Sequence, residues 1–188
     1  MQYQRLSIPE IILLSPKRFG DGRGFFSETF NAKAYQDIGI DADFVQDNHS
    51  LSSEPFVIRG LHFQTPPFAQ DKLVRVTRGS VLDVAVDIRH GSPTFGSHVS
   101  AILSSDNWNQ LWVPKGFAHG FCTLEPDTEF LYKVSGYYAP ENDAGLAWDD
   151  PALGIDWPVP DGCTPLLSDK DKDHPKLSDI DKYFSYDP

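Results

Sequence analysis

The chain has 188 residues, of which 40% are hydrophobic and 23% are charged, and its formal net charge is −11. Length and composition predict one globular domain over residues 1–188, and no apolar run approaches the roughly 18 residues that a membrane-spanning helix needs. The negative charge argues against nucleic acid or an anionic membrane as the main partner.

The N-terminal segment, Met1–Pro16, lacks the basic start and long apolar core of a signal peptide and is predicted to form a strand. The segment from about residue 161 to 188 is polar and is expected to lie at the periphery. The chain has only two cysteines, Cys122 and Cys163, which are too few for a disulfide framework. We therefore expect a reducing, cytoplasmic location.

Short strands dominate the rest of the chain. In order, the predicted strands are Gly24–Phe30, Lys72–Thr77, Val81–Ile88, His98–Leu103, Gln110–Val113, Gly120–Thr123, Glu129–Val134 and Gly145–Trp148. A hairpin turn is predicted at Arg78-Gly79. Two short helices are expected, one capped by Asn31 and ending at Asp37, and one capped by Ser178 and ending at Phe184. Together these elements predict an all-β, jelly-roll (cupin-like) double-sheet barrel with a few short peripheral helices.

The segment RGLHFQTPPFAQDKLVRV, residues 59–76, combines basic residues with a buried strand pattern. Lys72 shares a strand face with Val74 and Val76, whereas Arg75 falls on the opposite face. A lysine on an apolar face is costly unless an anionic group meets it. The pattern therefore predicts a binding site inside the fold.

In a regular strand, Arg59 and His62 point to opposite faces and cannot share one cavity. Gly60 lies between them, at a position where a bulge is easily accommodated. We therefore predict an irregularity at Gly60.

Three further polar residues are candidates. Tyr132 shares a face with Phe130, and Glu28 lies between Phe26 and Phe30. A buried tyrosine more often makes only a local hydrogen bond, whereas a buried carboxylate needs a partner. His119 lies in a glycine-rich turn, where a histidine is more often structural.

A metal site has little support in the sequence. Cupin metalloproteins use a His-x-His pair, but here the matching positions are His62-Phe63-Gln64, with one imidazole. His62, His119 and Glu28 could supply three ligands, but no spacing motif supports that set. No phosphate-binding loop or dinucleotide fingerprint is present either. We expect no metal and no cofactor.

The remaining set is a base candidate (His62), a cation (Lys72), a phenol (Tyr132) and arginines. Histidine titrates near neutral pH and suits removal of a proton beside a carbonyl group. A lysine stabilises the enolate that forms, and a tyrosine can return a proton from the other face. Arginines suit an anionic group such as a diphosphate.

Six motifs in this order resemble the dTDP-4-dehydrorhamnose 3,5-epimerase family: FGDGRGFFSETFN, FVQDNHSLS, RGLHFQTPPFAQDKLVRV, GSVLDVAVDIRHGSPTFG, VPKGFAHGF and EFLYKVSGYYAP. The resemblance implies a dTDP-4-keto-6-deoxy sugar substrate, with His62 as base, Lys72 as enolate stabiliser and Tyr132 as acid. It also implies that His62 pairs with a carboxylate of the motif LSDKD at residues 167–171, which we assign to Asp171, with Asp169 as the alternative.

The resemblance further implies a set of nucleotide and sugar contacts. Arg23 and Arg59 are expected on the diphosphate, His119 on the phosphate or sugar side, and the remaining contacts are Glu28, Gln46, Asp47, Asn48, Tyr138, Asp143 and Lys170. Asp143 stands where the family usually has a glutamate. Family members are homodimers that exchange the N-terminal strand, so Arg23 is expected to serve the partner's site.

Two other functions remain open at this stage. A related dTDP-sugar epimerase that inverts only C3 or only C5 would use the same residues. A non-catalytic carbohydrate-binding jelly roll would explain the aromatic and arginine residues, but it has no use for a base, an acid and a buried lysine together.

Overall fold

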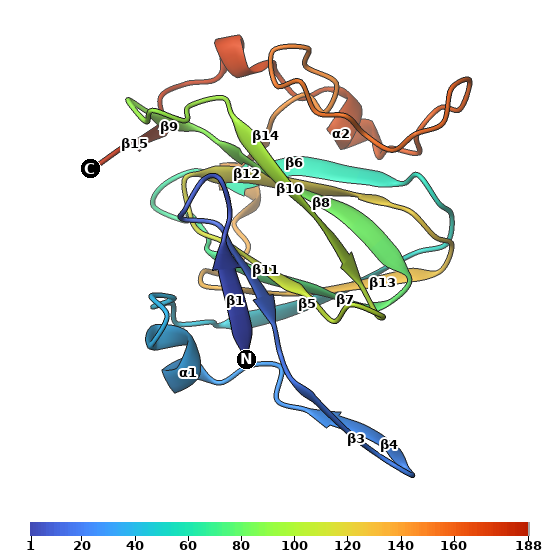
Figure 1. Cartoon of the computed structure of the whole chain (residues 1–188). Helices are drawn as coiled ribbons and strands as arrows, with labels where there is room; N and C mark the ends of the chain where they lie inside the picture. Colours follow the sequence, from blue (N-terminus) through green and yellow to red (C-terminus); the bar gives the residue numbers. More distant parts are fainter. Residues whose placement is uncertain (188) are drawn as a thin grey trace.

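A computed structural model describes residues 1–187 and contains two antiparallel sheets packed face to face (Figure 1). The six-stranded sheet, in the order β1-β2-β11-β7-β13-β5, contains β1 (Gln2–Arg5), β2 (Ile12–Ser15), β5 (Gln46–Ser52), β7 (Lys72–Arg78), β11 (Gln110–Val113) and β13 (Thr128–Val134). The five-stranded sheet, in the order β10-β8-β12-β6-β14, contains β6 (Ile58–Gln64), β8 (Ser80–Asp87), β10 (His98–Ser104), β12 (Phe117–Thr123) and β14 (Asp143–Gly145). The all-β jelly-roll prediction is confirmed.

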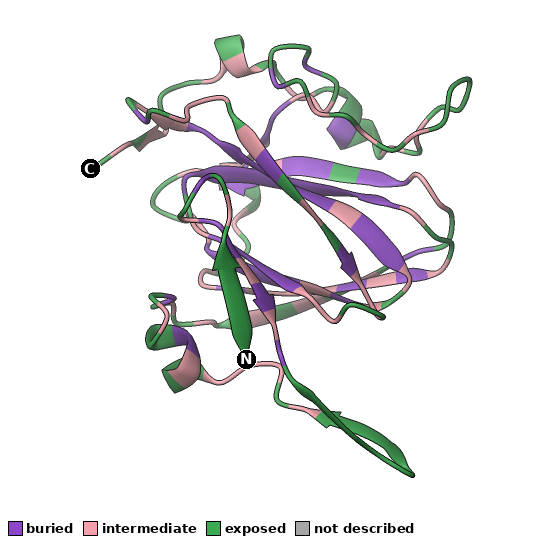
Figure 2. Ribbon diagram, viewed as in Figure 1, coloured by how far each residue is buried: buried purple, intermediate pink, exposed green. Residues whose placement is uncertain are grey.

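The sheets enclose an apolar core, visible as the buried strands of Figure 2. On β8, Val81 and Ala85 face this core, whereas Val84 and Val86 face the other side of the sheet. A second apolar layer, which includes Trp157 of the C-terminal segment, covers that outer face. Strand β8 is therefore buried on both faces.

One of the two predicted helices is confirmed. Helix α1 (Ala32–Gln36) begins where Asn31 accepts a hydrogen bond from the backbone of Ala34. Its Tyr35 packs with Leu73 and Trp112 against the outer face of the six-stranded sheet. Within the described residues, no helix is long and apolar enough to cross a membrane.

The predicted hairpin at Arg78-Gly79 is wrong, because β7 and β8 belong to different sheets. The chain instead turns a corner from one sheet to the other at Gly79, whose φ is +75°. A Cβ at this position would lie 2.3 Å from Oγ1 of Thr128. Arg78 and Gly79, which suit a tight turn, therefore connect a strand of one sheet to a strand of the other.

The segment predicted as strand Gly24–Phe30 ends earlier, as β4 (Gly24–Ser27), and pairs only with β3 (Arg18–Asp21). This hairpin projects away from the sheets (Figure 1). Phe26 is 69% exposed, and Glu28 follows the strand and is exposed. The prediction that Glu28 is buried between two phenylalanines is wrong, because alternation does not reveal whether a hairpin joins a sheet.

The C-terminal segment also differs from the prediction. The expected helix from Ser178 to Phe184 is absent; the segment instead contains the 3₁₀ turn η2 (Leu177–Asp179) and the short strand β15 (Phe184–Ser185), which pairs with β9 (Arg89–His90). Another 3₁₀ turn, η1, spans Pro140–Asn142, and helix α2 spans Asp169–Lys172. Ser168 caps α2, and this helix contacts β6.

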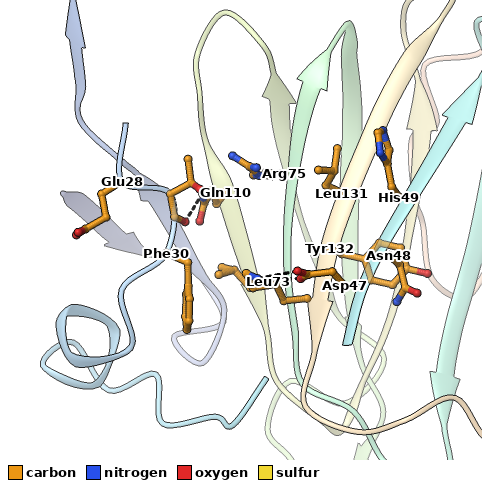
Figure 3. A pocket seen from close by; sticks show the side chains of 12 residues that line it. Glu28, Phe30, Asp47, Asn48, His49, Leu73, Arg75, Gln110, Leu131 and Tyr132 are labelled. Carbon is orange, nitrogen blue, oxygen red and sulfur yellow. Dashed lines mark hydrogen bonds and ion pairs between the residues drawn. The ribbon is translucent and has the colours of Figure 1, made fainter. Parts of the chain in front are cut away.

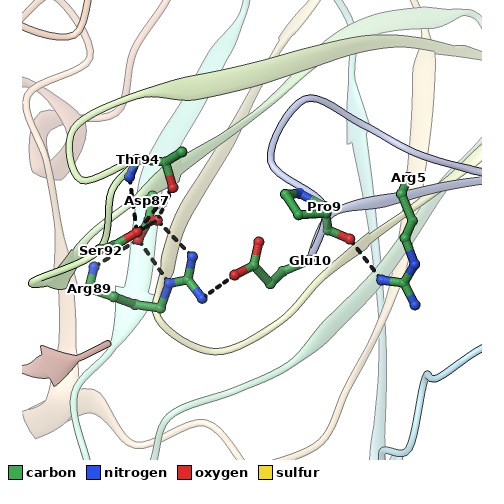
Figure 4. A network of polar contacts seen from close by, with 7 residues as sticks. All are labelled: Arg5, Pro9, Glu10, Asp87, Arg89, Ser92 and Thr94. Carbon is green, nitrogen blue, oxygen red and sulfur yellow. Dashed lines mark hydrogen bonds and ion pairs between the residues drawn. The ribbon is translucent and has the colours of Figure 1, made fainter. Parts of the chain in front are cut away.

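A polar network centred on Arg89 fastens the N-terminal segment to the end of β8 (Figure 4). Its guanidinium binds both oxygens of the fully buried Asp87 and also Glu10, at 2.7 Å from Oε1. The hydroxyls of Ser92 and Thr94 donate to Asp87 as well. This carboxylate is fully hydrogen-bonded.

Candidate active site

The predicted irregularity at Gly60 is present. His62 pairs with His119 and Arg59 pairs with Phe121, so β6 advances three residues while β12 advances two. Gly60 has φ +111°, and a Cβ there would lie 2.6 Å from the carbonyl oxygen of His119. The extra residue turns Arg59 and His62 toward the same cavity.

This cavity, of about 510 Å³, lies between the two sheets. The side chains that matter for chemistry come from both sides: His62 and His119 from the five-stranded sheet, and Lys72, Phe130 and Tyr132 from the six-stranded sheet. A base and a phenol therefore approach the same space from facing sheets.

His62 is paired with Asp171, whose Oδ1 lies 2.5 Å from Nε2. A carboxylate can only accept, so Nε2 donates and Nδ1 is left as the free acceptor. Ser168 donates to the other oxygen of Asp171 at 2.7 Å. Burial would raise the pKa of Asp171, but the hydrogen bonds from His62 and Ser168 outweigh it and lower the pKa. The alternative, Asp169, is exposed and pairs with Lys172.

Lys72 is 9% exposed, and its Nζ donates to the carbonyl oxygen of His62 at 3.2 Å. Burial lowers the pKa of Lys72 to about 8, while the nearby negative charges of Asp143 and Asp83 act against that fall. The side chain is therefore an ammonium group at neutral pH, as the predicted anion-binding role requires.

Asp83 is a member of the site that sequence reasoning missed. It is fully buried on the inward face of β8, and its Oδ1 accepts from Nε2 of His119 at 2.9 Å. Burial raises the pKa of Asp83, and the partner His119 only partly offsets this effect. Asp83 shares a face of β8 with the core residues Val81 and Ala85, but no sequence pattern marks His119 as its partner.

Tyr132 occupies the facing wall of the cavity beside Phe130. Burial raises the pKa of its phenol, so the hydroxyl keeps its proton across the neutral range. Phe130 in turn stacks on Phe121 at a centroid distance of 4.0 Å. Two stacked aromatic rings therefore line this part of the cavity.

A second cavity, of about 350 Å³, shares His62, Lys72 and Tyr132 with the first. Five of the predicted binding residues line it: Gln46, Asn48, Tyr138, Asp143 and Lys170. The hydroxyl of Tyr138 donates to Asp143 at 2.9 Å, and Lys170 forms an ion pair with the same carboxylate. Hydrogen bonding to Asp143 raises the pKa of Tyr138.

Three predicted binding residues lie elsewhere. Arg23 sits on the β3–β4 hairpin, 90% exposed and paired with Asp21. Glu28 and Asp47 line a third cavity, of about 450 Å³, on the outer side of the six-stranded sheet (Figure 3); Asn48 and Tyr132 also contribute to it. Asp47 there pairs with Lys133 at 2.8 Å. The ligand set considered for a metal is therefore not assembled, because Glu28 is in another cavity and Nε2 of His119 faces Asp83.

Two more residues near the His62–Asp171 pair were not predicted. Ser168 binds Asp171, and the ring of His174 lies 5.4 Å from that of His62, centroid to centroid. Both come from the polar segment after residue 161, where no periodic pattern marks a buried position. Burial lowers the pKa of His174, and the neighbouring His62 lowers it further.

Comparisons with known proteins show the family of this chain. A family model described as dTDP-4-dehydrorhamnose 3,5-epimerase matches residues 5–179. The dTDP-4-dehydrorhamnose 3,5-epimerase of Sinorhizobium fredii is 54% identical over 186 residues, which is 99% of this chain and 94% of the relative. That of Escherichia coli is 53% identical, with 92% of each chain covered.

Among solved structures, the dTDP-6-deoxy-D-glucose-3,5-epimerase of Legionella pneumophila superposes with a TM-score of 0.94. It is 46% identical, and the match covers 100% of this chain and 99% of that one. That crystal structure contains dTDP-4-keto-L-rhamnose.

Proposed function

Because this chain belongs to the dTDP-4-dehydrorhamnose 3,5-epimerase family, whose members are isomerases, we propose that it converts dTDP-4-dehydro-6-deoxy-D-glucose to dTDP-4-dehydro-L-rhamnose. The observation that carries the proposal is the placement of His62 and Tyr132 on facing sheets around one cavity. Inversion of a carbon centre needs a base on one side and an acid on the other, and this arrangement supplies both.

The first step is proton removal at C3, where the neighbouring C4 ketone makes the C–H bond acidic. Nδ1 of His62 takes the proton, and the electron pair of the C–H bond moves onto the C4 oxygen. The ammonium of Lys72 stabilises the enolate oxygen, and the carboxylate of Asp171 stabilises the imidazolium.

In the second step, the hydroxyl of Tyr132 donates a proton to the opposite face of the carbon, and the enolate collapses back to the ketone. His62 then releases its proton to solvent and Tyr132 takes one up, so that the same three groups can act at C5, which is also adjacent to the C4 ketone. No metal is required in this mechanism, because Lys72 supplies the positive charge that a metal would otherwise provide.

The nucleotide is proposed to lie at the open end of the joined cavities. Arg59 and His119 suit the diphosphate, while Gln46, Asn48, Tyr138, Asp143 and Lys170 surround the thymidine and sugar. These cationic and hydrogen-bonding groups provide a local attraction for an anion in a chain of net charge −11.

We further propose a homodimer in which the partner completes the site. Strand β1 is an edge strand of the six-stranded sheet and is exposed along its whole length, which suits pairing with a second chain. The projecting β3–β4 hairpin could then carry Arg23, with Glu28 after it, to the partner's nucleotide. The proposed location is the cytoplasm, where both free cysteines stay reduced and the product leads toward rhamnose-containing polysaccharide.

The test is turnover of dTDP-4-dehydro-6-deoxy-D-glucose in D₂O, followed by NMR of C3 and C5. Deuterium and inversion at both carbons are expected. Label and inversion at one carbon only would show an epimerase of narrower action, and no turnover with tight dTDP binding would indicate a non-catalytic binding protein.

A further inference from the structure

His174 is a buried imidazole that the proposed mechanism does not use. Its side chain is 9% exposed, and its Nε2 has no hydrogen-bond partner among the described residues. A buried polar nitrogen without a partner is costly, so its retention needs an explanation. Gly145 makes room for the ring, since a Cβ at that position would lie 2.6 Å from Nε2.

The free nitrogen of His174 faces the His62–Asp171 pair. Nε2 lies 3.8 Å from Oδ1 of Asp171, and one donor atom from each of His174, Asp171 and His62 lies within 4.8 Å of the other two. Two imidazoles and one carboxylate are a common ligand set for zinc and for cobalt in its place. We propose that His62, Asp171 and His174 form a binding site for a zinc-type divalent cation, and that the bound cation switches the proposed epimerase off.

The distances are compatible with a tetrahedral ion. Metal–ligand bonds of about 2.0–2.1 Å place neighbouring donors about 3.3 Å apart, so the two contacts made by Asp171 must each change by less than about 1 Å. The present separations lie on either side of that value. Oδ1 of Asp171 is 2.5 Å from Nε2 of His62 and 3.8 Å from Nε2 of His174. Ser168 holds the second oxygen of Asp171 and leaves Oδ1 for the cation.

The inhibitory effect follows from the histidine tautomer. In the active form, Nε2 of His62 carries the ring proton and Nδ1 has the free lone pair. A cation on Nε2 takes the lone pair of that nitrogen, so the one remaining ring proton moves to Nδ1. Because Nδ1 is then protonated, it cannot accept the substrate proton. The cation takes the place of the proton between Nε2 of His62 and Asp171, and His62 can no longer act as the base.

The metal site itself is independent of the proposed function, whereas the inhibition rests on it. The first experiment is therefore a titration of the full chain with Co²⁺, followed by visible absorption. Wild type should bind one equivalent with the intense bands of a four-coordinate ion, and Zn²⁺ should displace it. His174→Ala should weaken Co²⁺ binding at least about tenfold, and the bulkier His174→Gln should do the same if Ala disturbs packing.

His49→Ala is the matched control, because His49 is an exposed histidine paired with a carboxylate, Glu129. It should bind Co²⁺ as wild type does. Equal Co²⁺ affinity in wild type and in both His174 variants would overturn the site.

The second experiment measures turnover during Zn²⁺ titration. Wild type should lose activity and recover it with a chelator, while His174→Ala should keep its basal turnover and need at least about tenfold more Zn²⁺. Full wild-type turnover with one Co²⁺ or Zn²⁺ bound would refute the tautomer argument. Absence of turnover in every metal-free sample would instead count against the proposed function, and the absorption titration would still decide the site.

Discussion

Strand β8 carries two fully buried carboxylates, Asp83 and Asp87, on the same face and four residues apart. Asp87 accepts from the backbone and guanidinium of Arg89 and from two hydroxyls, and these donors outweigh burial and lower its pKa. Asp83 accepts one hydrogen bond, from His119, and burial raises its pKa. Two carboxylates without exposed surface therefore have pKa values shifted in opposite directions, and Asp87 is the one with more hydrogen-bond donors.

The contrast separates a structural cluster from a functional one. Both oxygens of Asp87 are hydrogen-bonded, and Arg89 links this carboxylate to Glu10, so the cluster joins β8 to the N-terminal segment. Oδ2 of Asp83 has no partner among the described residues, and the charge of this group acts on Lys72 instead. The molecule thus accepts an incompletely paired carboxylate where it holds an ammonium group in the cavity.

The largest expected effect tests the functional cluster. His62→Asn should lower kcat by about 10³-fold or more, because it removes the proposed base. Affinity for dTDP, measured by calorimetry, should stay close to wild type, since the nucleotide is proposed to bind other residues. His49→Asn is the control and should keep full turnover; a similar loss in both variants would contradict the assignment of His62.

The structural cluster is tested by Arg89→Met. This change leaves Asp87 buried without its ion-pair partner, so the free energy of unfolding should fall by about 3 kcal/mol or more. Turnover per folded molecule should not change. Arg78→Met removes an exposed ion pair with Asp127 and should alter stability by less than about 0.5 kcal/mol in urea unfolding. Equal destabilisation by the two variants would count against a special role for the Arg89 network.

Replacing each β8 carboxylate by its amide sharpens the contrast directly. Asp83→Asn removes a charge that opposes the fall in the pKa of Lys72, so kcat at pH 8 should drop about two- to fivefold. The folded pKa of Asp83 is raised, so its charged form costs stability above that pKa, and Asn should relieve this cost. Asp87→Asn should instead destabilise the fold and spare kcat. Loss of stability in Asp83→Asn together with loss of kcat in Asp87→Asn would contradict the division into a functional and a structural carboxylate.

The least perturbing test is the pH dependence of the wild-type protein. Lys72 must be protonated to stabilise the enolate, and its pKa is lowered to about 8. Turnover should therefore fall about tenfold per pH unit above pH 8. The contribution of Lys72 to stability has the other sign: its folded pKa lies below the unfolded value, so this contribution rises between about pH 8 and 10. Turnover that stays flat to pH 10 would show that the ammonium is not needed.

Local patterns predicted the features that depend on neighbouring residues. Alternation placed Lys72 on the inward face of β7, and Gly60 marked the irregularity that lets Arg59 and His62 share a cavity. Longer-range choices could not be predicted this way. The turn at Gly79 does not encode which sheet follows, and the alternation around Glu28 does not show that its hairpin leaves the sheets.

The site was predicted unevenly for the same reason. Resemblance to the family pointed to Asp171, which lies in a polar segment with no alternating pattern. His174 and Ser168 lie in that segment as well, and nothing in the sequence marks them as neighbours of the His62–Asp171 pair. Tertiary packing of helix α2 against β6 brings them there.

The central claim is that His62 removes the proton and Tyr132 returns one from the opposite side. The most direct measurement is solvent-deuterium exchange at C3 and C5 in two variants, with the configuration of each carbon read by NMR. Tyr132→Phe should incorporate deuterium without inversion, because His62 can still remove a proton and return one to the same face. His62→Asn should show neither exchange nor inversion. Exchange at the wild-type rate in His62→Asn would contradict the account.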